Sequence, residues 1–468
     1  MNPRRLFIPL VLLPLLAILF TDCQKDRFLA GKKGDFRISK DTVLFDTVFT
    51  TVNTVTKEFK IFNERSQALK IENITLAGGE NSQYRINVDG QAGDHHEDVR
   101  IPGNDSIHVF VEARIDPTGS NNAMIVTDSV IVQSGDHRGK VNLAAWGQDA
   151  YFHKNVIYSC SGGPIVWSND KPHVIYGTAA IDTNCTLEIE QGTQIHLHGN
   201  SRLVVLNNGK LDVQGTKAQK VVFQGDRLEP IYDDEPGQWE RIWLIGNQGS
   251  RIEHAIIKNS VIGLQVDTVG TSGTPSVTIL NTIIKDASST GLLAQAGAHV
   301  VAQNSLFRDC GKFTAALTSG GRYEMTHCTF ANYWEHGDRN DPSFVMSNYY
   351  EAADGQIVKR SIEQTNFTNC IFYGSRDEEF VVDTKSGPTL DYLFEYSLVK
   401  SKNAPSGSHY NQIFHNQDPG FKSTNGDKDY RLGAGAFPID EGKTGTGVSE
   451  DLNENARDAQ PDLGAYEK

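Results

Sequence analysis

A short pattern that recurs along the middle of the chain limits the fold more than any other feature. Two apolar residues and a third, usually polar residue precede Asn or Asp at 256–259, 283–286, 306–309 and 329–332, and an altered copy lies at 371–374. The steps from Ile257 onward are 27, 23, 23 and 42 residues. Each copy is followed by a second short apolar stretch. A unit of this size predicts one coil of a β-solenoid, because a single coil cannot bury its apolar face without neighbours.

Stacking of such coils predicts one inward ladder, made of Ile257, Ile284, Phe307, Phe330 and Phe372. Asn or Asp at the end of each copy fits a corner, since these residues tolerate a left-handed backbone. Asn ladders at corners are a feature of parallel β-helices of the pectate-lyase type, which residues 151–417 resemble. The resemblance implies a right-handed parallel β-helix. Cys310, Cys328 and Cys370 fall beside the ladder and are expected to be buried small side chains.

Residues 39–150 carry a different pattern, in which apolar and polar residues alternate over short segments separated by turn residues. This pattern predicts strands that each bury one face, as in an antiparallel β-sandwich. The segment also resembles immunoglobulin-like domains of the abnormal-spindle and hydin type. The resemblance rests on a strand ending near Asn63, a Leu-x-Ile strand from Leu69, a Pro102-Gly103 step and Asp116-Pro117. It implies a spacer or adhesive module. We therefore expect an all-β chain, with a sandwich before the β-helix.

Residues 418–468 end in Asp462-Leu-Gly-Ala-Tyr-Glu467, after Tyr430-Arg-Leu and Ile439-Asp440. This ending resembles the choice-of-anchor Q type found in exported bacterial β-helix proteins. A solenoid needs a polar cap, because its last coil otherwise presents an open edge. We expect residues 418–468 to form that cap.

The first residues have the features of an export signal. Arg4 and Arg5 precede an apolar run at 6–20 that is too short and too rich in proline to span a membrane. Cys23 follows, so residues 1–22 resemble a lipoprotein signal, which implies lipidation of Cys23 and a tether at 23–38. The charged residues at 24–27 look like the tether of surface-exposed Bacteroidetes lipoproteins. These features predict a lipid-anchored protein of the cell envelope, outer membrane or cell surface. An ordinary signal peptide with an incidental Cys is the alternative.

The formal net charge of −14 argues against nucleic acid as a partner, because phosphate binding needs clustered Lys and Arg. It argues less strongly against polyanionic sugars, which a local basic groove could still bind. Cys160 and Cys185 flank the start of the β-helix and can pair in an oxidising compartment. The sequence contains no CxxC pair, so no structural zinc site is expected.

Two segments are candidate walls of a binding groove. In the first, Asp233 and Asp234 lie near Trp239 and Trp243, and carboxylates with aromatic rings suit sugar or Ca²⁺ binding. The alternative is an acidic surface loop with tryptophans that pack. No cofactor other than Ca²⁺ is indicated.

The second segment is the expanded coil of the 42-residue step. Its candidate residues are Trp334, His336, Asp338, Arg339 and Asp341. A basic residue beside carboxylates suits proton abstraction from a uronic acid. The alternative is a loop without catalytic function.

His196 and His198 lie two residues apart on one strand, so both side chains point to the same face. Two imidazoles could contribute to a metal site. The alternative is a polar outer face of one coil, since the sequence shows no third ligand.

Three functions fit these features. The first is a non-catalytic envelope protein that binds glycan or protein, the second is a polysaccharide lyase or related carbohydrate enzyme, and the third is a structural envelope component. The three differ in what a groove should contain. An enzyme should bring Arg or Lys and two carboxylates from different coils together, a binding protein should show an aromatic strip, and a structural rod should be smooth.

Overall fold

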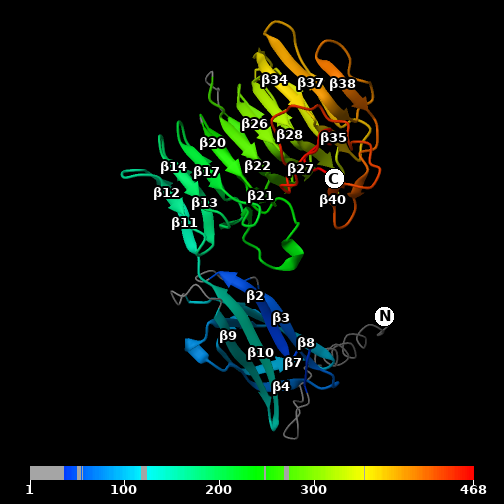
Figure 1. The fold of residues 1–468 in the computed structure, drawn as a ribbon. Coiled ribbons are helices and arrows are strands. Elements are labelled where there is room, and N and C mark those ends of the chain that lie inside the picture. The colour runs from blue at the N-terminus through cyan, green and yellow to red at the C-terminus, as the bar shows by residue number, and fades with distance from the viewer. Residues whose placement is uncertain are drawn as a thin grey trace, which may run out of the picture. The chain divides into compact units, whose positions relative to one another are not determined.

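The computed structural model describes residues 36–49, 54, 56–116, 124–246, 249–267, 273–352 and 354–468. The predicted signal at 1–22, Cys23 and most of the predicted tether at 23–38 lie outside these residues. The chain divides into two compact units, Met1–Asp149 and Ala150–Lys468, which are described separately. Within the described residues, the secondary structure is strands and two 3-10 turns, η1 (Gly79–Asn81) and η2 (Pro230–Tyr232). None of these segments is a helix long and apolar enough to cross a membrane. The predicted all-β class is confirmed (Figure 1).

The first unit is a sandwich of two five-stranded sheets. One sheet has the order β1 (Arg37–Ile38), β3 (Lys57–Asn63), β8 (Asp105–Ala113), β5 (Tyr84–Val88) and β6 (Gln91–Gly93). The other has the order β2 (Thr42–Phe49), β10 (His137–Gln148), β9 (Met124–Ser134), β4 (Leu69–Leu76) and β7 (His95–Ile101). The strands pair antiparallel except β2 with β10. Alternate residues such as Phe59, Ile61 and Val109 are buried in one core between the sheets, as the sequence pattern predicts.

The second unit is a parallel β-solenoid in which each strand pairs with a strand of the next coil, so that three faces result. Face A consists of β15 (Gln194–Leu197), β18 (Val221–Gly225), β21 (Ala255–Lys258), β24 (Ile283–Ala287), β27 (Leu306–Cys310), β30 (Thr329–Asn332) and β35 (Ile371–Gly374). Face B consists of β16 (Arg202–Val205), β19 (Arg241–Ile245), β22 (Ile262–Asp267), β25 (Thr290–Gln295), β28 (Phe313–Leu317), β31 (Phe344–Ser347) and β36 (Phe380–Asp383).

Face C consists of β12 (Ile165–Trp167), β14 (Thr186–Ile189), β17 (Lys210–Gln214), β20 (Ser250–Glu253), β23 (Val277–Leu280), β26 (His299–Gln303), β29 (Arg322–Thr326) and β34 (Ile362–Thr368). Longer strands at the two ends of the solenoid are β11 (Tyr151–Tyr158), β13 (His173–Ile181), β37 (Leu390–Val399) and β38 (Tyr410–His415). Two antiparallel pairs lie outside the three faces, β32 (Tyr349–Glu351) with β33 (Ile357–Lys359) and β39 (Phe421–Ser423) with β40 (Asp429–Leu432).

The predicted inward ladder lies on face A. The five residues are aligned from strand to strand and fully buried, in the order Ile257, Ile284, Phe307, Phe330 and Phe372. Neighbouring phenyl rings stack with centroids 4.8 and 4.9 Å apart, which is within the range of offset-stacked aromatic pairs. The three predicted core thiols, Cys310, Cys328 and Cys370, are buried and free.

The expected left-handed backbone occurs in three of the four repeat copies that end in Asn or Asp; the exception is Asn332, which lies buried on β30 and donates to the Cys310 carbonyl at 2.9 Å. Asn259, Asp286 and Asp309 have φ values of 65°, 52° and 51°, in the left-handed region that Asn and Asp tolerate. Their side chains project near the outer surface of face A, where the candidate site is found.

The C-terminal segment packs along the outer side of face A. Tyr430, Leu452 and Ala465 cover Leu306 and Ala331, and a neighbouring cluster consists of Leu432, Leu463, Ile371, Tyr373 and Leu398. In Figure 1 this red segment returns across β27 and β35. The physical reason is that the outward positions of these strands are apolar and need a cover that excludes water.

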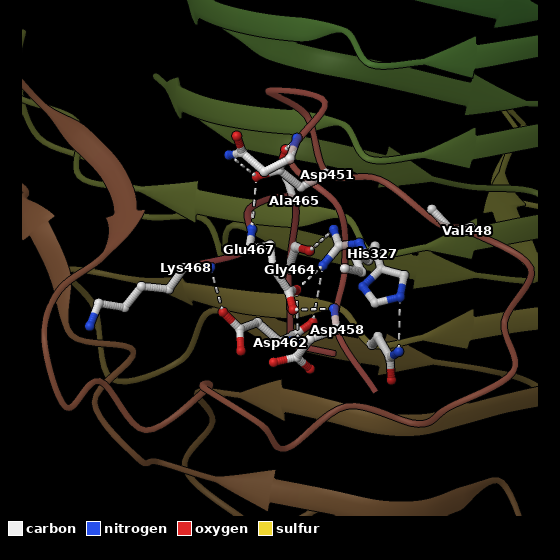
Figure 2. Close-up of polar contacts among 12 residues, drawn as sticks. His327, Val448, Asp451, Asp458, Asp462, Gly464, Ala465, Glu467 and Lys468 are labelled. Carbon is white, nitrogen blue, oxygen red and sulfur yellow. Dashed lines mark hydrogen bonds and ion pairs between the residues drawn. The ribbon is translucent and has the colours of Figure 1, made fainter. Parts of the chain in front are cut away.

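The Asp-Leu-Gly-Ala-Tyr-Glu ending fixes this cover in place (Figure 2). Glu467 forms a buried 2.9 Å ion pair with Arg457, and its amide donates to Asp451 at 2.9 Å. Gly464 has φ +87°, and a Cβ there would lie 2.5 Å from the hydroxyl of Thr329. The motif therefore needs glycine at the point where it touches the solenoid.

Candidate functional site

A column of three basic side chains runs along the outer surface of face A. The third residue of three successive repeats is Lys258, Lys285 and Arg308, and the strand registers align these positions. We call these three residues the basic column. Neighbouring strands of a sheet are about 4.8 Å apart, so the column carries one cation at each step along the solenoid. The three side chains are 10, 15 and 16% exposed, and cations this well covered need anionic partners.

The partners of the two lysines include carboxylates of the loop after β18. Asp233 forms an ion pair with Lys258, and Asp234 approaches Lys285 at 2.8 Å. Lys285 also lies 2.9 Å from Asp286, on its own strand. The first predicted groove wall thus places both of its carboxylates on the basic column.

The carboxylates beside Arg308 come from the solenoid itself. Arg308 pairs with Asp309, and lies 3.9 Å from Asp286. Asp309 also accepts hydrogen bonds from the Tyr430 hydroxyl at 2.7 Å and from Lys428 at 3.3 Å. Asp309 therefore holds the C-terminal segment, whereas Asp286 remains at the wall of a cavity.

That cavity has a volume of about 660 Å³ and lies over the Arg308 end of the basic column. It is lined by face A and by three other segments that are far apart in the sequence, and the lining residues are Asp234, Asp286, Arg308, Glu335, His336, Gly426, Asp427, Lys428, Asp429 and Arg431. The two predicted groove walls meet here, since His336 Nδ1 lies 3.9 Å from a carboxylate oxygen of Glu235. Sequence reasoning missed the third wall, at 426–431.

The pKa values of the two cavity carboxyls, Asp286 and Asp234, are shifted in opposite directions. Burial raises the pKa of Asp286 above its ordinary value, and Lys285 and Arg308 only partly oppose that effect. Partial burial also acts to raise the pKa of Asp234, but the hydrogen bond and charge of Lys285, with Lys258 and Arg308 behind it, lower it overall. Pairs of carboxyl groups whose pKa values differ in this way occur at sites of proton transfer.

Two of the predicted tryptophans cannot act in this cavity. Trp239 is 1% exposed in the solenoid core, and its indole N–H donates to the Lys258 carbonyl at 2.8 Å. Trp243 lies on β19 of face B, where it donates to Asp267 at 2.8 Å. Of the two alternatives for these rings, ligand binding or packing, Trp239 adopts packing, because its side chain points into the solenoid core. Trp334 lies beside the cavity, with its ring centroid 5.0 Å from that of His336.

Arg339, one of the candidate catalytic residues, is buried and paired within its own coil. Its side chain is 3% exposed and forms an ion pair with Glu379, which is fully buried. It also donates to the carbonyl of Asp341 at 2.8 Å. Because the Arg339 guanidinium is buried and paired with Glu379, it cannot reach a substrate. Asp341 takes part only through its backbone carbonyl, which accepts a hydrogen bond from Arg339. Asp338, in contrast, is exposed in the loop.

The two candidate metal ligands have separate partners. His196 is 4% exposed and its Nδ1 lies 3.1 Å from the Gly225 carbonyl, and burial lowers its pKa to about 4. His198 is exposed and pairs with Asp226 at 2.7 Å. Across the described ranges, no group of three or more His, Cys, Asp or Glu side chains could hold a metal ion. The structure joins Cys160 and Cys185 in a disulfide, with their Cα atoms 5.2 Å apart.

Comparisons with known proteins agree with the solenoid. The family model described as "Right handed beta helix region" matches residues 262–430. This part of the chain is a right-handed β-helix. No curated protein matches the chain.

Three solved structures show distant similarity. The first is a family 123 glycoside hydrolase from Clostridium perfringens, with 8% identity, a TM-score of 0.19 and coverage of 25% of this chain and 30% of that one. The chain therefore spans less than a third of that hydrolase. An ASH/PapD-like domain of human CEP192 has 9% identity, a TM-score of 0.17 and coverage of 32% and 96%. The catalytic unit of a GH87 α-1,3-glucanase from Streptomyces thermodiastaticus strain HF3-3 has 9% identity, a TM-score of 0.26 and coverage of 80% and 90%.

Proposed function

We propose that this chain is an exported, lipid-anchored protein of the cell envelope that binds a carbohydrate in the cavity beside the basic column. The observation that carries the proposal is the convergence of three distant segments on one polar cavity of about 660 Å³, a volume typical of small-ligand sites. A lining of carboxylates, amines and guanidinium groups suits a ligand rich in hydroxyl groups. The export signal, Cys23 and the anchor-type ending support the envelope location, and the sandwich is a spacer or adhesive module.

A carbohydrate-active enzyme, such as a polysaccharide lyase, is the second candidate. It is favoured by a specific observation, because Arg308 lies beside Asp286 and Asp309 from successive strands of face A. The combination meets the enzyme criterion only in part, because Asp309 is held by Tyr430 and Lys428 and does not line the cavity. Asp286 is the group best suited to transfer a proton, since its pKa is raised and it borders the cavity. A purely structural role gives no account of the cavity.

A glycan array with the chain from residue 24 onward tests the binding proposal, and the same samples are examined for unsaturated or shortened products. The site variant is His336→Gln, which changes an accessible cavity residue, and Asp354→Asn is the control on a surface turn. We expect glycan binding that His336→Gln weakens and Asp354→Asn leaves unchanged. If products form and Asp286→Asn abolishes their formation, the chain is an enzyme rather than a binding protein. If no glycan binds, the proposal is rejected.

A further inference from the structure

We propose that Cys328 and Cys370 form a disulfide that joins two successive coils of the solenoid when the chain folds in an oxidising compartment. The structure holds these two residues as buried thiols. The bond would close the 42-residue step of the repeat, which carries the second predicted groove wall. The inference concerns a covalent modification of the solenoid core, so it does not depend on the proposed carbohydrate binding.

The strand register places the two cysteines side by side, at the corner between face C and face A. The strands before and after this corner pair with the same offset of 42 residues, so Cys328 lies opposite Cys370. The preceding residues, His327 and Asn369, have φ values of 54° and 56°, so both coils turn this corner through the same left-handed backbone. Neighbouring strands are about 4.8 Å apart, which lies within the range of about 4.4–6.8 Å for the Cα atoms of a disulfide.

The two thiol groups are also in contact with each other. The Cys370 thiol has the thiol and the backbone amide of Cys328 as hydrogen-bonding neighbours. It reaches into the coil of Cys328, where the Met325 carbonyl lies 3.5 Å from its sulfur. Both side chains are fully buried, and burial with the neighbouring thiol raises the pKa of Cys370 well above its ordinary value. The folded dithiol therefore holds little reactive thiolate, and the bond has to form before this coil packs.

Hydroxyl side chains occupy the same corner position in the neighbouring coils. The strand registers align the two cysteines with Thr282, Ser305 and Ser397. Each of these hydroxyls donates to the carbonyl two residues earlier, at 2.8, 2.8 and 2.9 Å. The sulfurs of Cys328 and Cys370 lie 3.6 and 3.4 Å from the equivalent carbonyls, and a thiol is a weaker donor than a hydroxyl. Hydrogen bonding thus favours Ser or Thr at each corner, whereas a cross-link accounts for cysteine at two successive corners.

The position of the pair in the chain also suits a cross-link. The structure joins Cys160 to Cys185, 25 residues apart, near the start of the solenoid, and such a bond persists in an oxidising compartment. Cys328 and Cys370 span the longest step of the predicted ladder, and a cross-link restricts the unfolded chain more when the loop that it closes is longer. In the reaction, the two thiols lose two protons and two electrons. The electrons reduce the S–S bond of a disulfide oxidant to two thiols.

The test is a disulfide map of the full-length chain, which is exported by a bacterium, extracted in detergent, alkylated in denaturant without reduction and digested with trypsin. We expect the tryptic peptides 323–339 and 361–376 to be linked, with a mass two hydrogen atoms below the sum of the free peptides. The Cys160–Cys185 bond is the positive control. Cys310, which aligns with Ala287 outside this corner, should be alkylated. Alkylation of both Cys328 and Cys370, or a link of either to Cys310, overturns the inference.

A second measurement compares the melting temperature of the exported chain with that of Cys328→Ser/Cys370→Ser, which places the hydroxyls of the neighbouring coils at both corners without a cross-link. We expect the double variant to melt about 5–10 °C lower. The difference should disappear when both chains are unfolded, reduced and refolded in dithiothreitol. Cys310→Ala removes another buried thiol, and its difference from the original chain should be the same before and after reduction. Equal melting of the oxidised original chain and the double variant, or a difference that reduction does not change, contradicts the cross-link.

Discussion

Replacement of Arg339 by Met should unfold part of the β-helix rather than remove a catalytic group. The guanidinium donates to both carboxylate oxygens of Glu379, and one of these contacts measures 2.7 Å. It also donates to the Asn332 carbonyl at 3.1 Å. Methionine fills a similar volume but leaves the Glu379 carboxylate fully buried without its cation. The carboxylate would retain only two donors, the backbone amides of Ser343 and Arg376, each at 2.8 Å.

The magnitude follows from this loss. Breaking a buried ion pair by removing one partner costs about 3–5 kcal/mol. The double variant Arg339→Met/Glu379→Gln should be less damaged than the sum of its single variants, because no unpaired charge then remains buried. The difference isolates the cost of the orphaned carboxylate.

Hydrogen exchange across residues 332–380 is the appropriate assay, supported by urea unfolding of the whole chain. We expect faster exchange in this coil for Arg339→Met and partial recovery in the double variant. A loss below about 1 kcal/mol, which is the range of exposed ion pairs, would refute the argument. The same experiment determines how activity data are read, since an inactive Arg339 variant indicates catalysis only if its coil is still folded.

Three further predictions concern stability. Phe330→Ala should cost about 3–5 kcal/mol in urea unfolding, because its ring is stacked between two others at 4.8 and 4.9 Å. Gly464→Ala should lower the melting temperature and expose residues 451–468 to exchange, since φ is +87° and the new Cβ would meet Thr329. Burial lowers the pKa of His327 to about 3, so the folded chain keeps it neutral while the unfolded chain protonates it below its ordinary value of 6.5. Its contribution is complete above pH 6.5 and falls by about 2 kcal/mol at pH 5, and His327→Gln should flatten this part of a pH series of urea unfolding.

The fold was predictable because a solenoid repeats one environment many times. Each coil places Ile or Phe at the same inward position and Asn or Asp at most of the corners, so the sequence carries the signal several times over. In the sandwich, the alternation of apolar and polar residues predicts the strands and their buried faces just as directly. The sequence did not decide whether Trp239 packs or faces a ligand, because this residue lies where a loop enters a strand and the alternation of inward and outward side chains is not yet established there.

The site was only partly predictable, because its parts are far apart in the sequence. Asp234 and His336 were identified, but nothing near Arg339 indicates that its partner is Glu379, 40 residues later. The wall at 426–431 depends on a segment that folds back over earlier coils. The basic column was not predicted either, although its residues Lys258, Lys285 and Arg308 occupy the third position of three successive repeats.

The return of the C-terminal segment over face A has a consequence for biogenesis. Until residues 418–468 have emerged and docked, Leu306, Ile371 and Leu398 form an apolar strip on the outside of an otherwise complete solenoid. A chain that folds during synthesis or export therefore exposes this apolar strip to water until residues 418–468 have also emerged. A chaperone would find its most exposed apolar target at this stage, and docking of the Asp-Leu-Gly-Ala-Tyr-Glu segment removes that target from water.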